Sequence, residues 1–88
     1  MDFEYDPQKS ESNKIKHGID FEEAKSIWND YDYAEVELEW KTERRFMVIG
    51  KTESRHWSAI CTIRDSMIRI ISVRRSRSIE INIYEEDR

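Results

Sequence analysis

The sequence predicts an α+β domain in which two N-terminal helices pack on a roughly four-stranded antiparallel sheet, after a short first strand. Three observations support this prediction. Helix start and stop signals gather in residues 6–23, apolar residues recur at every second position from residue 33 onward, and 88 residues are enough for one small domain. We therefore treat residues 1–88 as a single domain.

The first helix is predicted from its two ends. Phe3-Glu4-Tyr5 alternates like a short strand and stops at Asp6-Pro7, where Asp6 fits an N-cap and Pro7 the first helical position. The helix covers about residues 7–17 and is mostly polar, with Ile15 as its main apolar anchor. Gly18 fits a C-cap, because glycine adopts the left-handed backbone conformation at little steric cost.

The second helix is predicted at about residues 21–29. Asp20 can cap it, and Glu23 lies three positions on, where it completes a capping box. The apolar residues of this segment fall on one helical face and indicate a buried stripe: Phe21, Ala24, Ile27 and Trp28.

Four strands follow. Residues 33–40 alternate strictly between apolar and polar side chains, and Phe46–Ile49 is a continuous apolar run that fits a central strand. A third strand is predicted at residues 56–63 and a fourth at Met67–Val73, after a tight turn at Arg64-Asp65-Ser66. Residues 41–44 and 51–55 fit hairpin connections.

The C-terminal segment at residues 78–85 is ambiguous. Ile79, Ile81 and Ile83 alternate as in a strand. The segment also contains two i,i+4 pairs, Ile79 with Ile83 and Glu80 with Tyr84, that fit a helix. Periodicity alone leaves both structures open.

Charge is distributed unevenly along the chain. The net charge is −4, yet residues 20–43 contain nine Asp or Glu against two Lys, and residues 44–77 contain nine Lys or Arg against two acidic residues. The second block could bind nucleic acid, because eight of its nine cations are Arg, which makes bidentate contacts to phosphate. Alternatively, acidic and basic strands simply pair across the sheet.

Several classes of protein and site are disfavoured. Cys61 is the only cysteine, so no internal disulfide or zinc motif is expected, and the two glycines cannot build a phosphate-binding loop. Cys61 lies in an apolar run and fits a buried side chain, although Cys–His catalysis stays open on geometry. We see no signal peptide and no apolar run of membrane length, and expect a soluble cytoplasmic protein without metal or cofactor.

Three arginines are candidates for a phosphate site. Arg45 falls on the strand face opposite Phe46, Arg64 ends a strand, and Arg69 interrupts an apolar strand. A charge in such a strand needs either a partner, such as Glu35, Glu37, Glu39 or Glu43, or a functional reason. Arginines could stabilise the dianionic phosphorane formed when a ribose 2′-OH attacks its phosphate.

Further polar residues extend this candidate site. His17 could move protons, because histidine is a common acid–base group near neutral pH, or it could only cap the first helix. Arg74, Arg75 and Arg77 leave the last strand as a basic patch, which is either a nucleic-acid contact or a solvated surface.

The chain resembles the BrnT toxin family. The matching segments are Phe3–Pro7 with Lys9 and Asn13, Lys16–Ala24, Glu43 with Arg45-Phe46 and Ile49-Gly50, Thr62 with Arg64, and Ile68–Arg75. This resemblance implies a RelE-like fold with a C-terminal helix. It also implies a metal-independent endoribonuclease toxin of a type II toxin–antitoxin pair, neutralised by BrnA, a ribbon-helix-helix antitoxin that alone contacts DNA.

The site follows from the resemblance together with the chemistry. We expect Arg45, Arg64 and Arg69 to bind phosphate and His17 and Glu43 to transfer protons, while Lys16, Arg74 and Arg75 bind RNA. The last helix is poorer in cations than is usual in the family, so Ile79, Ile83 and Tyr84 are expected to bind antitoxin. The assembly we expect is a dimer of the chain or a heterotetramer of the chain with its antitoxin. The alternative is a catalytically weak or inactive interaction module that binds a basic partner.

Overall fold

A computed structural model describes residues 2–86. The elements in chain order are β1 (Phe3–Glu4), α1 (Pro7–His17), α2 (Phe21–Ala24), the 3-10 helix η1 (Lys25–Asn29), β2 (Ala34–Leu38), β3 (Arg45–Thr52), β4 (Arg55–Arg64), β5 (Met67–Arg75) and α3 (Ser78–Glu86). The α+β class is therefore confirmed, and the segment that periodicity left open is the helix α3. None of the helices within residues 2–86 is long and apolar enough to cross a membrane.

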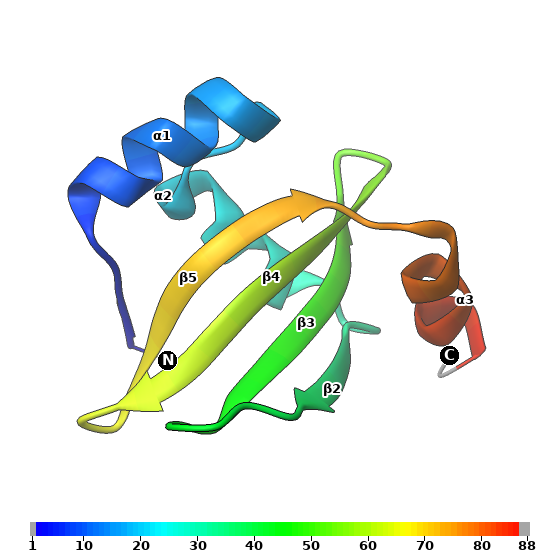
Figure 1. Cartoon of the computed structure of the whole chain (residues 1–88). Coiled ribbons are helices and arrows are strands. Elements are labelled where there is room, and N and C mark those ends of the chain that lie inside the picture. Colours follow the sequence, from blue (N-terminus) through cyan, green and yellow to red (C-terminus); the bar gives the residue numbers. More distant parts are fainter. Residues whose placement is uncertain (1, 87–88) are drawn as a thin grey trace.

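The sheet differs from the prediction of four antiparallel strands. The described residues form a five-stranded mixed sheet in the order β1-β5-β4-β3-β2. β1 adds to the edge of β5 in parallel, with Phe3 opposite Ile68, whereas the other pairs are antiparallel (Figure 1). β2 is also shorter than predicted. It ends at Leu38, and Trp40 lies beyond it with 56% of its surface exposed.

The cap predictions for the N-terminal helices are confirmed. Asp6 accepts a hydrogen bond from the Gln8 N–H at 2.9 Å, and Gly18 ends α1 with φ of 82°. The capping box of Asp20 and Glu23 is complete. Because these signals depend only on neighbouring residues, they are legible in the sequence.

The second helix is shorter than predicted. The α-helix stops at Ala24, and η1 replaces the rest of the expected 21–29 helix. Here the Ser26 hydroxyl donates to the Glu23 carbonyl at 2.7 Å, and the Lys25 N–H is shared between the Glu22 and Glu23 carbonyls. Such competition for carbonyls favours the tighter i→i+3 turn.

Polar side chains anchor α1 to the sheet. Ile15, the expected apolar anchor, is 89% exposed, whereas Ser10 and Asn13 are buried. The Asn13 amide donates to the Val73 carbonyl at 2.9 Å and accepts from the Val73 N–H at 3.2 Å. It thereby replaces a missing strand at the edge of β5, and its second donor bond reaches the Ile19 carbonyl at 2.8 Å.

Two apolar clusters lie on opposite faces of the sheet. The helical face packs against α1, α2 and η1 through the larger cluster, which includes Phe21, Ile27, Val48, Cys61 and Val73. The other face packs against α3 through a smaller cluster of Ala34, Met47, Ile49 and Tyr84. The two N-terminal helices therefore pack on one face of the sheet, and α3 covers part of the opposite face (Figure 1).

One glycine allows η1 to approach the sheet. A β-carbon at Gly50 in β3 would lie 2.9 Å from the Ile27 carbonyl oxygen and 2.7 Å from an Ile27 methyl carbon. Because contacts below 3.0 Å to backbone are not tolerated, only glycine fits between β3 and η1.

Candidate functional site

Arginines from two strands lie in one row on the α3 face of the sheet. Arg45 of β3 is opposite Thr62 of β4, and Thr62 is opposite Arg69 of β5. β1 extends the row, because Glu4 is opposite Arg69. With adjacent strands about 5 Å apart, the two arginine backbones are roughly 10 Å apart. We call Arg45, Thr62 and Arg69 the arginine row.

Both arginines of the row are held by carboxylates. Arg45 Nε donates to Glu43 Oε2 at 2.8 Å, and its guanidinium lies 4.1 Å from the centre of the Trp40 ring. Arg69 Nη1 donates to Glu4 Oε1 at 3.2 Å. The side chains are only 22% and 28% exposed, so the row is partly shielded from water. These contacts fix the positions of the guanidinium groups before a ligand binds.

Arg64 adds a cation at the end of β4. It is two positions after Thr62, opposite Met67, and is exposed. Within residues 2–86 it has no ion-pair or hydrogen-bond partner. Three of the predicted phosphate-binding residues therefore lie on the same sheet face, with Glu43 beside them.

Arg74 forms an ion pair within the fold. Its guanidinium makes two hydrogen bonds to the Glu80 carboxylate, at 2.8 and 2.7 Å, and this pair ties β5 to α3. Burial alone would raise the pKa of Glu80. Hydrogen bonds from Arg74, the Arg77 N–H and Ser58, together with the charge of Arg74, instead lower that pKa to about 2. Arg74 is thus engaged at the base of α3.

Lys16 and His17 lie away from the arginine row. They end α1 and line a shallow depression at the β5 edge with Ile71 and Ser72. Arg75 follows at the end of β5 and lies 5.6 Å from the centre of the Trp57 ring. The structure thus separates these predicted RNA contacts from the row, which is on the sheet face itself.

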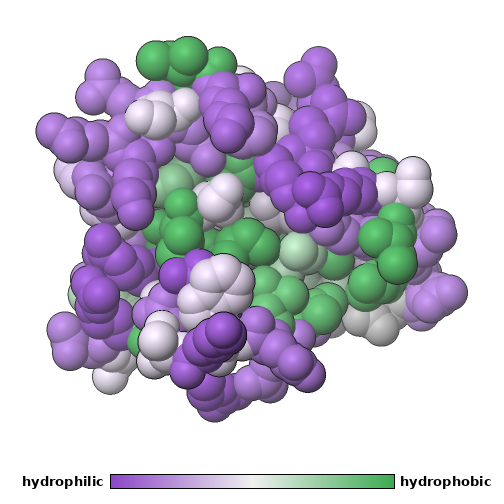
Figure 2. Space-filling model, viewed as in Figure 1, coloured by the Kyte–Doolittle hydropathy of each residue, from purple (hydrophilic) through white to green (hydrophobic). Residues whose placement is uncertain are grey.

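The three residues predicted to bind antitoxin differ in exposure. Ile79 is 68% exposed, Ile83 packs against the smaller cluster, and Tyr84 is 3% exposed. The Tyr84 hydroxyl donates to Asp30 Oδ2 at 2.7 Å. Figure 2 shows apolar side chains gathered at the centre of the α3 face of the sheet, surrounded by hydrophilic ones.

Cys61 is not a nucleophile in this structure. Its side chain is fully buried, and burial, aided by the nearby Glu35 charge, raises the pKa of the thiol to about 12. The thiol therefore stays protonated at neutral pH. This closes the possibility of Cys–His catalysis that the sequence left open.

Three residues of the site have no predicted role in the sequence analysis: Thr62, Glu4 and Trp40. A fourth such residue, His56, lies at the other end of β4 and packs edge-on against Tyr84. Within residues 2–86 its buried Nε2 atom has no hydrogen bond, and Glu85 Oε2 lies 4.0 Å away. The strand register could have pointed to Thr62 and Glu4, but this register depends on long-range pairing.

The family comparison bears on this geometry. A family model described as "Ribonuclease toxin, BrnT, of type II toxin-antitoxin system" matches residues 5–80. This match covers most of the chain, including every strand from β2 to β5.

The chain belongs to the BrnT family.

It is therefore a BrnT-type ribonuclease toxin, and the type II class implies a protein antitoxin as its partner. A search of the curated proteins found no match to the chain. Within residues 2–86, no group of three or more His, Cys, Asp and Glu side chains is arranged to hold a metal ion.

Proposed function

We propose that this BrnT-family chain is a metal-independent endoribonuclease that cleaves RNA on the α3 face of its sheet and so inhibits translation. The observation that carries the proposal is the arginine row, which places two oriented guanidinium groups on either side of Thr62. Arg64, at the end of the same face, supplies a third cation near the substrate.

The chemistry needs charge stabilisation and proton transfer. The 2′-oxygen of a ribose attacks the adjacent phosphorus, its proton leaves to a base, and the bond to the 5′-oxygen breaks as that oxygen gains a proton. The products are a 2′,3′-cyclic phosphate and a 5′-hydroxyl. Arg45 and Arg69 would stabilise the dianionic phosphorane, which is usually the largest catalytic contribution.

Proton transfer at the arginine row is assigned to Glu43. Glu43 is beside Arg45 and is the candidate base, because a carboxylate can accept a proton. His17, the other residue predicted to transfer protons, lies away from the row, so we assign it with Lys16 and Arg75 to contact with the RNA strand as that strand passes the β5 edge.

The antitoxin is proposed to be a BrnA-type ribbon-helix-helix protein. The α3 face has an apolar area (Figure 2), and Met47 and Ile60 in it are two positions from Arg45 and Thr62 on the same face. Ile79 of α3 is exposed as well. A partner bound there would cover the row and exclude RNA. In this proposal DNA is contacted only by the antitoxin.

Cleavage by the purified chain tests the proposal. Total RNA is incubated with the protein in excess chelator, beside Arg64→Ala and Arg69→Ala, with Arg55→Ala as a matched exposed control. We expect cleavage by the native chain and a loss of roughly 100-fold in each site variant, as for removal of one transition-state donor. The same residual rate in Arg55→Ala as in the site variants, or full activity in both site variants, contradicts the site.

A second function is favoured by the neutralised charges of the site. Arg45, Arg69 and Arg74 each pair with a carboxylate of the same chain, so phosphate must compete with these carboxylates. This arrangement also suits a catalytically weak module that binds a basic partner. A folded chain that neither cleaves RNA nor slows growth when expressed without an antitoxin would support this second function.

A further inference from the structure

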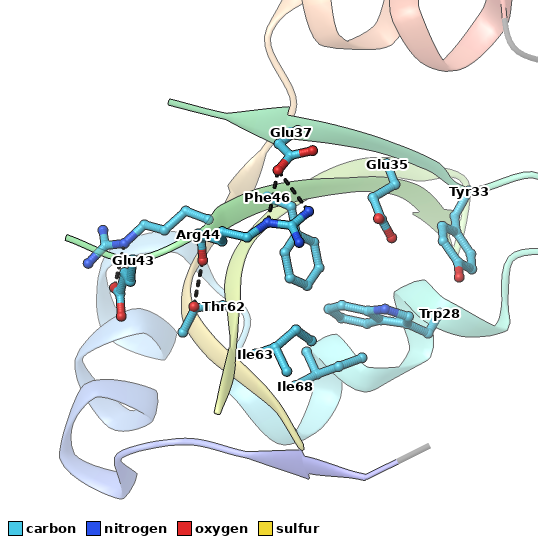
Figure 3. A pocket seen from close by; sticks show the side chains of 11 residues that line it. Trp28, Tyr33, Glu35, Glu37, Glu43, Arg44, Phe46, Thr62, Ile63 and Ile68 are labelled. Carbon is cyan, nitrogen blue, oxygen red and sulfur yellow. Dashed lines mark hydrogen bonds and ion pairs between the residues drawn. The ribbon is translucent and has the colours of Figure 1, made fainter. Parts of the chain in front are cut away.

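A pocket of about 440 Å³ opens on the helical face of the sheet. Its walls come from η1, β2, β3 and the β4–β5 hairpin (Figure 3). Glu43, together with Arg45 and Thr62 of the arginine row, also borders the pocket. Its volume is within the range of small-ligand sites.

The interior of the pocket is aromatic and aliphatic. Trp28, Tyr33 and Phe46 provide ring surfaces, and Ile63 and Ile68 complete the apolar wall. Figure 3 shows these side chains facing a common space. Ile63 is 58% exposed, which is unusual for an isoleucine in a central strand and marks the pocket as an uncovered apolar surface.

Two carboxylates form the rim above the rings. Glu35 and Glu37 project from β2 to the same side as Phe46, which is opposite Glu37 in the register. Within the described chain Glu35 has no hydrogen-bond or ion-pair partner. Carboxylates above aromatic faces attract a cation twice, through charge and through the ring quadrupole.

The chain already places one guanidinium at this rim. Arg44 Nε and Nη2 lie 3.0 and 2.8 Å from Glu37 Oε1, and Arg44 reaches across the pocket mouth (Figure 3). Both side chains are largely exposed, at 86% for Arg44 and 64% for Glu37. An ion pair this exposed is worth little and can be exchanged for a better-placed cation.

We propose that this pocket binds an arginine side chain presented by a protein partner, which displaces Arg44 from Glu37 and uses Glu35 as its second acceptor. Arginine is favoured over lysine because its planar group stacks on rings while it donates to two carboxylates. RNA is disfavoured, since its phosphates would meet Glu35 and Glu37. The inference does not depend on cleavage at the arginine row.

The experiment uses the peptide acetyl-Gly-Arg-Arg-Gly-amide as its probe, with a citrulline peptide as the neutral isostere. The readout is the indole N–H of Trp28 in a ¹⁵N-correlation spectrum of the full chain, assigned with Trp28→Phe. We expect a saturable shift with the arginine peptide. The citrulline peptide should bind at least fivefold more weakly.

Variants distinguish binding in the pocket from nonspecific attraction of the peptide to the net charge of the chain. Glu35→Gln with Glu37→Gln should weaken binding about fivefold, whereas Glu53→Gln with Glu86→Gln removes the same charge elsewhere and should leave it unchanged. Arg44→Ala should tighten binding two- to fivefold, because it removes the resident guanidinium.

Three results would overturn the proposal. These are equal weakening by both double variants, no effect of Arg44→Ala, and a Trp28 shift caused by a single-stranded oligonucleotide in place of the peptide. Ribonuclease activity is measured separately on the same proteins, so a native chain that cleaves RNA but gives no saturable Trp28 shift with the arginine peptide refutes this inference alone.

Discussion

The two faces of the sheet are covered by different kinds of interaction. On the helical face, α1 and α2 are anchored by a large apolar cluster and by neutral hydrogen bonds, in which the Asn13 amide donates to the Val73 carbonyl and the Ser10 hydroxyl accepts from the Phe21 N–H. On the opposite face, α3 is held by a small apolar cluster and by the carboxylates of Glu80 and Asp30. Neutral contacts change little with pH or salt, whereas charged ones do. The attachment of α3 to the sheet is thus the part of the fold most sensitive to pH and salt.

The largest expected effect is on the charged side of this comparison. Glu80→Ala removes a buried carboxylate that accepts from Arg74, Ser58 and the Arg77 N–H, leaving Arg74 without its partner. Breaking a buried ion pair in this way costs roughly 3 kcal/mol. Thermal or urea unfolding measures the loss, and Glu86→Ala, an exposed carboxylate of the same helix, should stay within about 0.5 kcal/mol.

The same carboxylate predicts an acid sensitivity. The folded-state pKa of Glu80, about 2, lies below its ordinary value of 4.5. Its stabilisation is therefore fully present above pH 4.5 and lost as the pH falls toward 2. Urea unfolding between these pH values should show a smaller decline for Glu80→Gln than for the native chain. Parallel declines in the two proteins would contradict the assignment.

On the helical face, Asn13→Ala should lower the free energy of unfolding by slightly less than Glu80→Ala does, about 2 kcal/mol. The substitution leaves the buried N–H and carbonyl of Val73 without partners, which costs the desolvation of each group. Amide hydrogen exchange at Val73 should accelerate, while Ser12→Ala, at an exposed position of the same helix, should leave it unchanged. Unlike the effect of Glu80→Ala, this loss should not vary with pH between 3 and 7.

Gly50→Ala tests how closely η1 approaches the sheet. The added β-carbon would overlap the Ile27 carbonyl, so η1 must move outward, at a cost of roughly 1–2 kcal/mol. Because Trp28 belongs to η1 and lines the pocket, its indole signal should shift as well. An unfolding free energy equal to that of the native chain would show that η1 can adjust freely.

The contrast between the faces also explains what the sequence could predict. Caps at Asp6, Gly18 and Asp20 were predicted correctly, because each depends on residues within one turn. The parallel pairing of β1 with β5 joins residues about 65 positions apart and leaves no local signal. The 3-10 turn after Ala24 was missed because helical periodicity does not distinguish it from an α-helix.

The candidate site shows the same division. Arg45 and Arg69 were selected because a charge in an apolar strand needs a reason, and the register then places them in one row with Thr62. Arg74 was predicted to bind RNA because it belongs to a basic patch at the end of the last strand. Its ion pair with Glu80 could not be predicted, because it forms only when α3 packs against the sheet. His17 was selected from the acid–base chemistry of histidine and from the family resemblance, and no sequence pattern indicated its distance from the row.

The smallest predicted effect concerns the far end of α3. Tyr84→Phe removes the hydroxyl that donates to Asp30 Oδ2 but keeps the ring packed against His56 and the smaller cluster. One hydrogen bond to a charged acceptor contributes about 1.5 kcal/mol, so the variant should unfold slightly more easily. If α3 is held mainly at its Glu80 end, hydrogen exchange in Tyr84→Phe should rise only after Ile81 and stay unchanged before it. Uniform acceleration along α3 would mean that both ends are needed, and that α3 separates from the sheet as a unit.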